Sequence, residues 1–266
     1  MTDIALWQYV TFAGSAFAAG IVDAIVGGGG LLQLPVLLGS LDVGGGVATP
    51  LGVNKAVTAI GNTASIAQFW RRNPDSRVDP RILIGPGLIA VVSASVGALF
   101  VSNVPIQTLR PIIIVCLLAA LVNTLRGTGK GKEQDRSEQS SRGRHAEIRL
   151  AAVSTVLGLY DGFVGPGTGT FLLLSHRRLL RRTLTDSLAT TKIIQCGMNI
   201  GGAAVLLSQG VFVWHLILLM GACSMGGASI GARIALNGKD QLIKRVLVAA
   251  VLATVVKLIY DQISSW

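Results

Sequence analysis

The sequence predicts an all-α integral membrane protein built from two inverted repeats, each with a broken, re-entrant glycine-containing unit and three transmembrane helices. Three observations lead to this prediction. Hydrophobic residues make up 51% of the 266 residues and charged residues only 14%, whereas a soluble domain carries about a quarter charged residues. Apolar runs long enough to cross a bilayer recur along the chain. The two halves of the sequence also resemble each other.

The apolar runs give the expected elements in chain order. Each is close to the roughly 20 residues that a helix needs to cross the hydrocarbon core. The first run follows Asp3 rather than a basic region and has no small-residue cleavage site, so we expect it to be part of the mature protein and not a signal peptide. The runs lie near residues 5–26, 51–70, 82–102, 107–125, 148–165, 184–207, 212–236 and 244–263.

A polar stretch divides the chain into two nearly equal halves. Residues 127–146, GTGKGKEQDRSEQSSRGRHA, are rich in glycine, serine and charge and poor in apolar residues. Such a segment has too little apolar surface to form a core, which predicts a flexible basic linker. We therefore expect a first transmembrane repeat over 1–126 and a second over 147–266.

The two halves align at their polar and glycine-rich motifs. The stretch VDAIVGGGG in the first half matches YDGFVGPGTG in the second, and NKAVTAIGN matches TKIIQCGMN. Internal repeats of this kind are the usual plan of secondary transporters. The alignment pairs Asp23 with Asp161, Gly27 with Gly165, Gly29 with Gly167, Lys55 with Lys192 and Asn62 with Asn199.

The charges of the loops predict the orientation. Lysine and arginine gather in the linker and near 71–81, 177–182 and 239–245, and the positive-inside rule places such segments in the cytoplasm. The linker and 177–182 flank one hydrophobic stretch, so both are cytoplasmic only if the glycine unit between them enters the membrane and returns. We expect the protein to lie in the cell (inner) membrane. Because each half then crosses this membrane three times, the second half is inverted relative to the first, and both termini are on the outer side. The net charge of +10 therefore reflects orientation and predicts no nucleic-acid partner.

The glycine-rich breaks are the first part of the candidate site. Irregular backbone survives at membrane depth only where it is buried in protein or lines a wet cavity. A half-helix that starts after such a break aims free N–H groups and its positive end at the cavity, which favours an anion. The glycines could instead permit tight helix packing. The candidate residues are Gly27, Gly28, Gly29 and Gly30 in the first half and Gly165, Gly167, Thr168 and Gly169 in the second.

Two lysines within apolar sequence are the second part of the candidate site. An ammonium group inside a membrane is costly unless it is paired or hydrated, so Lys55 and Lys192 are functional candidates. The alternative is that each lysine lies near a helix end and snorkels to the interface. Asn62 and Asn199 follow the two lysines by seven positions, which places each on the same helix face as its lysine.

Asp23 and Asp161 precede the two breaks at matched positions. Each could pair with a lysine, cap the turn that follows, or carry a coupling proton. Gln33 and Gln195 are further polar side chains in apolar stretches, but their positions do not match between the halves. The histidines do not cluster, and neither a Ser-His-Asp arrangement nor metal-ligand spacing is present. We therefore expect no enzyme activity, no metal and no cofactor.

At these motifs the sequence resembles the sulfite exporter TauE/SafE family of bacterial transporters. The resemblance rests on AGIVDAIVGGGGLLQLPVLL, on LGLYDGFVGPGTGTFLLL and on the NK…GN stretch after the first, and it covers nearly the whole chain. It implies transport of a small sulfur-containing anion such as sulfite, a sulfonate or thiosulfate, by export or by uptake. One departure concerns Asn54, because the second half has Thr191 at that position. The two half-sites therefore need not contribute equally to the substrate.

Together, the residues and the resemblance predict a secondary transporter embedded in the lipid bilayer. A small anion would bind between the repeats near the midplane, and one repeat would rock against the other, with the two aspartates as candidates for proton coupling. A passive anion channel is one alternative, because channels and carriers share polar linings. A membrane scaffold subunit without a transported substrate is the other.

Overall fold

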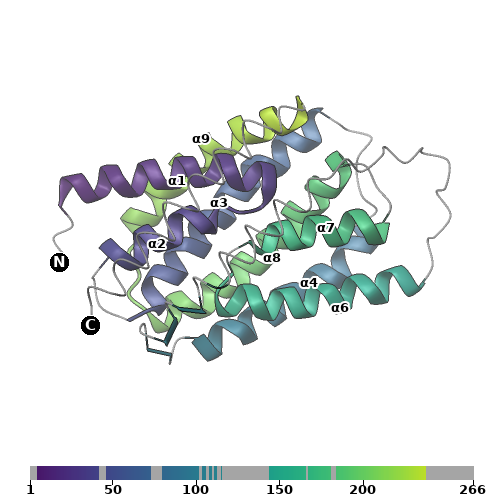
Figure 1. Cartoon of the computed structure of the whole chain (residues 1–266), viewed down its shortest axis with the longest axis horizontal. Helices are drawn as coiled ribbons and strands as arrows, with labels where there is room; N and C mark the ends of the chain where they lie inside the picture. The colour runs from purple at the N-terminus through teal and green to yellow at the C-terminus, as the bar shows by residue number, and fades with distance from the viewer. Residues whose placement is uncertain are drawn as a thin grey trace.

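The computed structural model describes residues 5–41, 46–72, 80–101, 144–165, 167–180 and 184–237, together with residues 104, 105, 108, 109, 111, 112 and 115. Eight long helices form this part of the chain, which confirms the all-helical prediction there (Figure 1). The first half contributes α1 (Leu6–Val26), α2 (Gly30–Ser40), α3 (Ala48–Arg72) and α4 (Pro80–Val101), and the second half contributes α6 (Arg144–Phe163), α7 (Thr168–Leu180), α8 (Leu184–Gln209) and α9 (Trp214–Leu236).

Several predicted segments lie outside the described residues. They include both termini, the apolar run 244–263, most of the run 107–125 and linker residues 127–143. Helix α6 begins at Arg144 and so starts within the last three residues of the predicted linker.

Each glycine motif interrupts a helix. Helix α1 ends at Val26 and is followed by Gly27 as its C-cap. The Gly27 φ of 78° lies in the left-handed region, and its N–H donates to the Asp23 carbonyl oxygen at 2.8 Å. Glycine is the residue that adopts this conformation without a steric penalty. In the second half, Gly165 and Gly167 have φ values of 85° and 80° between α6 and α7. In Figure 1, α2 turns back beside α1 and α7 turns back beside α6.

The helices of the two halves exchange partners. Helix α1 packs against α9 and α4 packs against α6, while α3 and α8 pack against each other in the middle. Close approach depends on small residues at aligned positions. A Cβ added at Gly20 would lie 3.0 Å from the Ala228 nitrogen, and one added at Gly158 would lie 3.4 Å from the Ala94 nitrogen. Equivalent glycines therefore support equivalent contacts between the halves.

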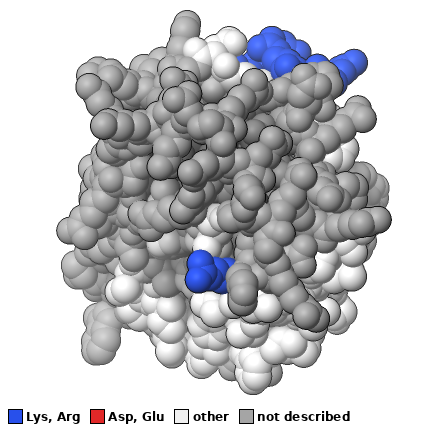
Figure 2. Space-filling view, turned by 90° about the vertical axis from the view of Figure 1, so that its right-hand side faces the viewer, with Lys and Arg blue, Asp and Glu red and all other residues white. Residues whose placement is uncertain are grey.

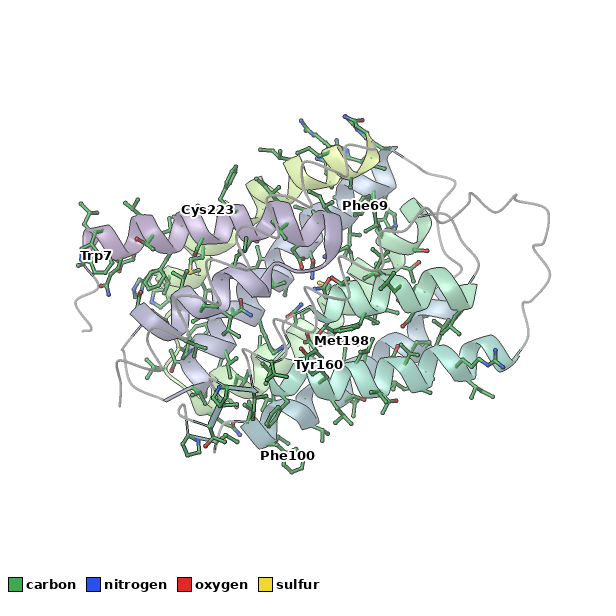
Figure 3. The ribbon with its side chains drawn as sticks, viewed as in Figure 1. Trp7, Phe69, Phe100, Tyr160, Met198 and Cys223 are labelled. Carbon is green, nitrogen blue, oxygen red and sulfur yellow. The ribbon has the colours of Figure 1, made fainter. Side chains whose placement is uncertain are left out.

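Apolar side chains cover much of the exterior, and polar side chains are concentrated inside. Trp7 and Phe100 point away from the bundle, whereas Phe69 and Met198 are buried in it (Figure 3). Among the described residues, the segments Ile84–Val101 and Trp214–Leu236 are long and apolar enough to cross a membrane. An apolar exterior around a polar interior is the arrangement that a lipid solvent favours.

Basic residues lie at one end of the molecule. The last turn of α3 carries Arg71 and Arg72, and the last turn of α9 carries Arg233. In Figure 1 both helices end at the upper right, above the right-hand side on which α6 begins and α7 ends. Figure 2 looks onto this end and shows Lys and Arg side chains on the described surface.

Candidate anion-binding site

Two buried ion pairs connect the halves at the helix breaks. Lys55 Nζ lies 2.8 Å from Asp161 Oδ2, and Lys192 Nζ lies 2.7 Å from Asp23 Oδ2. Each lysine thus pairs with the aspartate of the opposite half. The exposed fractions of Lys55 and Lys192 are only 2% and 0%, so neither lysine snorkels to the surface. Buried charges of this kind are retained when they are paired.

The position of each charged residue follows from its element. Asp23 and Asp161 lie in the last turns of α1 and α6, just before the breaks. Lys55 and Lys192 lie in the first half of α3 and of α8, the two central helices that pack against each other. The contact between α3 and α8 brings each lysine to the aspartate that precedes the break of the opposite half.

The breaks also touch each other directly. A Cβ added at Gly169 would lie 2.5 Å from Gly27 Cα, so the two backbones are in van der Waals contact with no room for a side chain. Glycine is therefore needed here for two reasons: it allows the two backbones to approach closely, and at Gly27 it allows the left-handed turn.

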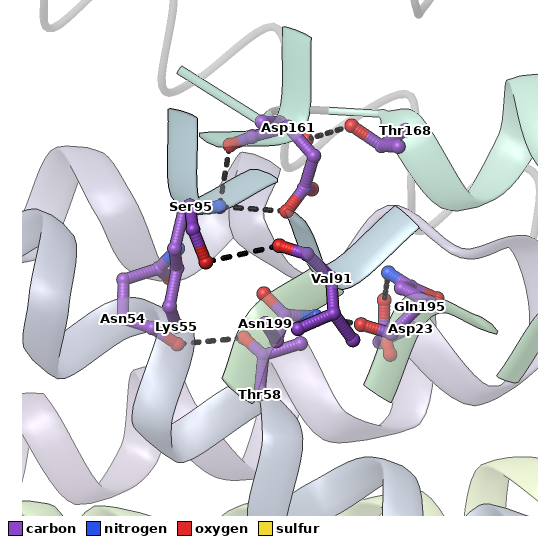
Figure 4. Close-up of polar contacts among 11 residues, drawn as sticks. Asp23, Asn54, Lys55, Thr58, Val91, Ser95, Asp161, Thr168, Gln195 and Asn199 are labelled. Carbon is purple, nitrogen blue, oxygen red and sulfur yellow. Dashed lines mark hydrogen bonds and ion pairs between the residues drawn. The ribbon is translucent and has the colours of Figure 1, made fainter. Parts of the chain in front are cut away.

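Around Lys192, the polar atoms form a closed network. Lys192 Nζ also donates to Gln195 Oε1 at 2.8 Å, and Gln195 Nε2 donates to Asp23 Oδ1 at 3.2 Å. The Gly29 N–H donates to the same Asp23 oxygen at 3.1 Å. Asp23 thus accepts from three donors and caps the turn that follows it, so pairing and capping occur together. Gln195 lies against Asp23 in Figure 4.

Lys55 has a simpler environment. Its Nζ donates to the carboxylate of Asp161 and to the carbonyl oxygen of the same residue (Figure 4). Within the described residues, the Asp161 carboxylate has no other hydrogen-bond donor. The residue three positions after Lys55 is Thr58, whose hydroxyl donates to the Asn54 carbonyl oxygen at 2.8 Å instead of joining the ion pair.

A small cavity lies on the Lys55 side of the breaks. Its volume is about 20 Å³, so it can admit water. An ammonium group, asparagine amides and the start of α2, whose first N–H groups have no acceptor within the helix, face this space. These are groups that suit an anion. The cavity is lined by Gly27, Gly30, Asn54, Lys55, Thr58, Asp161, Gly165, Gly167, Gln195 and Asn199.

The other predicted site residues do not line the cavity. Lys192 and Asp23 are engaged in their own network, and Gly29 donates to it. Thr168 Oγ1 donates to the Gly165 carbonyl oxygen at 2.7 Å. Asn62 is fully buried, and neither polar atom of its side chain has a hydrogen-bond partner among the described residues. Gly28 and Gly169 also belong to the breaks but not to the lining.

Two lining residues were not among the predicted site residues. Gln195 was noticed only as a polar residue in an apolar stretch, and Thr58 was missed. The alignment that pairs the lysines also pairs these two residues, because each lies three positions after its lysine. One helical turn places them beside the ammonium group, so this spacing could have identified both.

Comparison with known proteins identifies a transporter family and several relatives that are named as probable membrane transporters. The family model described as "Sulfite exporter TauE/SafE" matches residues 12–258. "Probable membrane transporter protein ORF9" of Sinorhizobium sp is 30% identical over 98% of this chain and 96% of its own length. "Probable membrane transporter protein YfcA" of Escherichia coli strain K12 is 31% identical over 93% of this chain and 88% of its own length. A probable membrane transporter protein of Haemophilus influenzae is 29% identical over 92% of both chains. No solved structure matches significantly.

Proposed function

Because the chain belongs to the sulfite exporter TauE/SafE family, we propose that it is a secondary transporter that moves a small sulfur-containing anion across the cell membrane by alternating access. The anion class comprises sulfite, sulfonates and thiosulfate. The observation that carries the proposal is the cavity at the helix breaks, where Lys55, Asn54 and Asn199 converge with the start of α2. A cation, amide donors and free backbone N–H groups together match the needs of an oxyanion.

The packing of the helices supports an inverted-repeat mechanism. Helices α1 and α6 occupy equivalent places in the sequence repeat, and they run in opposite directions in Figure 1. The exchange of partners between α1–α9 and α4–α6 is what a pseudo-two-fold relation produces. Rocking of one repeat against the other would expose the site alternately to the two sides. In the repeat, Lys192 is the equivalent of Lys55, and Asn62 is the equivalent of Asn199. These two residues would form the second half-site.

The basic end of the molecule supports the predicted orientation. Arg71, Arg72 and Arg233 lie at helix ends on the side where α6 starts. The positive-inside rule would place this end, and with it the linker, in the cytoplasm.

The occupied lysine at the cavity favours a carrier over a channel. The Lys55 ammonium is bound to the Asp161 carboxylate at 2.8 Å, so an anion that binds Lys55 has to replace this contact. A conducting channel instead needs a continuous aqueous path.

The test is anion binding to the purified protein in detergent, followed by thermal unfolding. The panel is sulfite, sulfate, thiosulfate, methanesulfonate, acetate and chloride. An anion present at about 100 times its Kd stabilises the folded protein by about 2.7 kcal/mol. We expect a sulfur oxyanion to raise the Tm of the wild type and to have no effect on the Lys55→Gln, Lys192→Gln double variant.

The matched control is Arg71→Gln, which removes one positive charge from an exposed site at the end of α3. It should keep the full anion-dependent shift. If no anion raises the Tm of the wild type, or if the double variant shifts as much as the wild type, the proposed site is wrong.

A further inference from the structure

We propose that the substrate anion displaces Asp161 from Lys55 and that Asp161 takes up one proton as this happens, whereas Asp23 stays ionised beside Lys192. The inference rests on the proposed function, which it deepens by assigning the coupling role to one of two equivalent aspartates. It follows from three features of the site: the number of donors on each carboxylate, their access to the cavity, and the charge balance.

The two carboxylates differ in their hydrogen bonds. Asp23 accepts from Lys192, Gln195 and the Gly29 N–H. Within the described part of the chain, Asp161 accepts through its carboxylate from Lys55 alone. Charge-assisted hydrogen bonds favour the ionised form of an acid. Protonating or moving the Asp161 carboxylate therefore disturbs fewer hydrogen bonds than protonating or moving the Asp23 carboxylate.

The two ion pairs also differ in access. Lys55 and Asp161 both line the cavity, whereas Lys192 and Asp23 do not. Lys55 is the cation among the residues that line the cavity, and an anion that binds it must replace a group already bound to it. The Asp161 carboxylate is the group already bound to the Lys55 ammonium, at 2.8 Å. The anion and this carboxylate thus compete for the same cation.

The charge balance then requires a proton. The Lys55–Asp161 pair is neutral, and a monovalent anion in place of the carboxylate would leave two negative charges beside one lysine in a buried site. A like charge nearby favours the protonated acid. If the carboxylate takes one proton from the buffered solution, the site is neutral again, and the new O–H becomes a donor for the anion. Anion and proton then occupy the site together and are carried in the same direction.

Other titratable groups near the breaks have different partners. On α8, Lys192 is paired with Asp23 of α1, and the Cys196 thiol lies 3.6 Å from the Ala59 carbonyl oxygen. On α7, His176 is hydrogen-bonded to Thr191. Helix α4, which packs along α6, has no titratable side chain over residues 84–101. Among the side chains that the structure describes, Lys55 on α3 is therefore the charged group that faces Asp161.

The experiment measures proton uptake on binding. Isothermal titration calorimetry of methanesulfonate, a monovalent anion, into the protein in detergent is run near neutral pH in two buffers with different ionisation enthalpies. Methanesulfonate does not titrate in this range, so a proton taken up goes to the protein. We expect about one proton per anion for the wild type and a Kd that weakens about tenfold per pH unit where Asp161 is ionised in the free protein.

The two aspartate variants test the assignment. Asp161→Asn should bind the anion with no proton uptake and with a Kd independent of pH, and Asp23→Asn should still take up about one proton. Anion binding by the wild type without proton uptake would overturn this inference and leave the proposed function standing. Uptake that survives in Asp161→Asn, or that is lost only in Asp23→Asn, would also overturn it. If the wild type binds no anion, both this inference and the proposed function are wrong.

The wild type alone can overturn the inference, whether or not the variants fold. If Asp161→Asn unfolds because Lys55 is left without its partner, the double variant Lys55→Gln, Asp161→Asn restores a neutral pair that can hydrogen-bond. It should fold, bind no anion and take up no proton. Anion binding with proton uptake in this double variant would contradict the inference.

Discussion

The Lys192–Asp23 and Lys55–Asp161 pairs occupy equivalent positions in the two halves, but their surroundings differ. Gln195 completes the first pair by bonding to both of its members. Thr58, at the aligned position, bonds to its own helix and leaves the second pair open to the cavity. The side-chain type one helical turn after each lysine, together with the Gly29 N–H that donates to Asp23, distinguishes the closed network from the accessible pair.

This difference indicates that the two equivalent ion pairs have different roles. A buried ion pair with all its polar atoms satisfied holds the two halves in a fixed relation. A buried pair beside a cavity has partners that a ligand can replace. Sequence symmetry therefore need not mean that both half-sites bind the substrate in the same conformation.

The largest expected effect is on the closed network. Lys192→Met leaves the buried Asp23 without its cation, and breaking such a pair costs about 3–5 kcal/mol. Lys55→Met should cost clearly less, because Asp161 lies at a cavity that can admit water. Thermal and denaturant unfolding in detergent compare the two variants with the wild type. Equal losses of stability would show that the two pairs do not differ in the way their surroundings indicate.

A smaller effect is expected at the glycines that start the two breaks. At either position an L-residue in the left-handed region costs roughly 1–2 kcal/mol. At Gly27 an added Cβ would also press on the Gly169 backbone, and overpacking typically adds about 1–3 kcal/mol. A Cβ at Gly165 would have its nearest neighbour at 3.0 Å, the Asp161 carbonyl oxygen. Gly27→Ala should therefore lower the Tm more than Gly165→Ala, and the reverse order would contradict the close contact between the breaks.

The smallest effect is expected at the two residues that distinguish the pairs. Gln195→Leu removes hydrogen bonds from both Lys192 and Asp23 and should cost about 1–3 kcal/mol. Thr58→Val removes one hydrogen bond to a carbonyl oxygen of its own helix and should cost about 1 kcal/mol or less. Unfolding free energies of the two variants give the comparison. A loss at Thr58 that matched the loss at Gln195 would mean that the hydroxyl also supports the Lys55 pair.

The helices and their breaks could be predicted from the sequence because their signals are local. Long apolar runs exclude a soluble fold, and a glycine run after an aspartate ends a helix through backbone conformation alone. The helices α1, α3, α4, α6, α8 and α9 lie close to the predicted apolar runs. The candidate lysines were found in the same way, because a charge within an apolar run stands out whatever the tertiary structure.

The partner of each charge was decided by the tertiary structure. Lys55 pairs with a residue 106 positions away and Lys192 with one 169 positions away, and both pairs cross between the halves. An isolated helix does not specify which distant carboxylate its lysine meets, because that choice depends on how α3 and α8 pack together. The same packing places Asn199 at the cavity and buries Asn62 away from it. The sequence by itself thus determined the breaks and the buried charges, and only long-range packing decided which of them share a cavity.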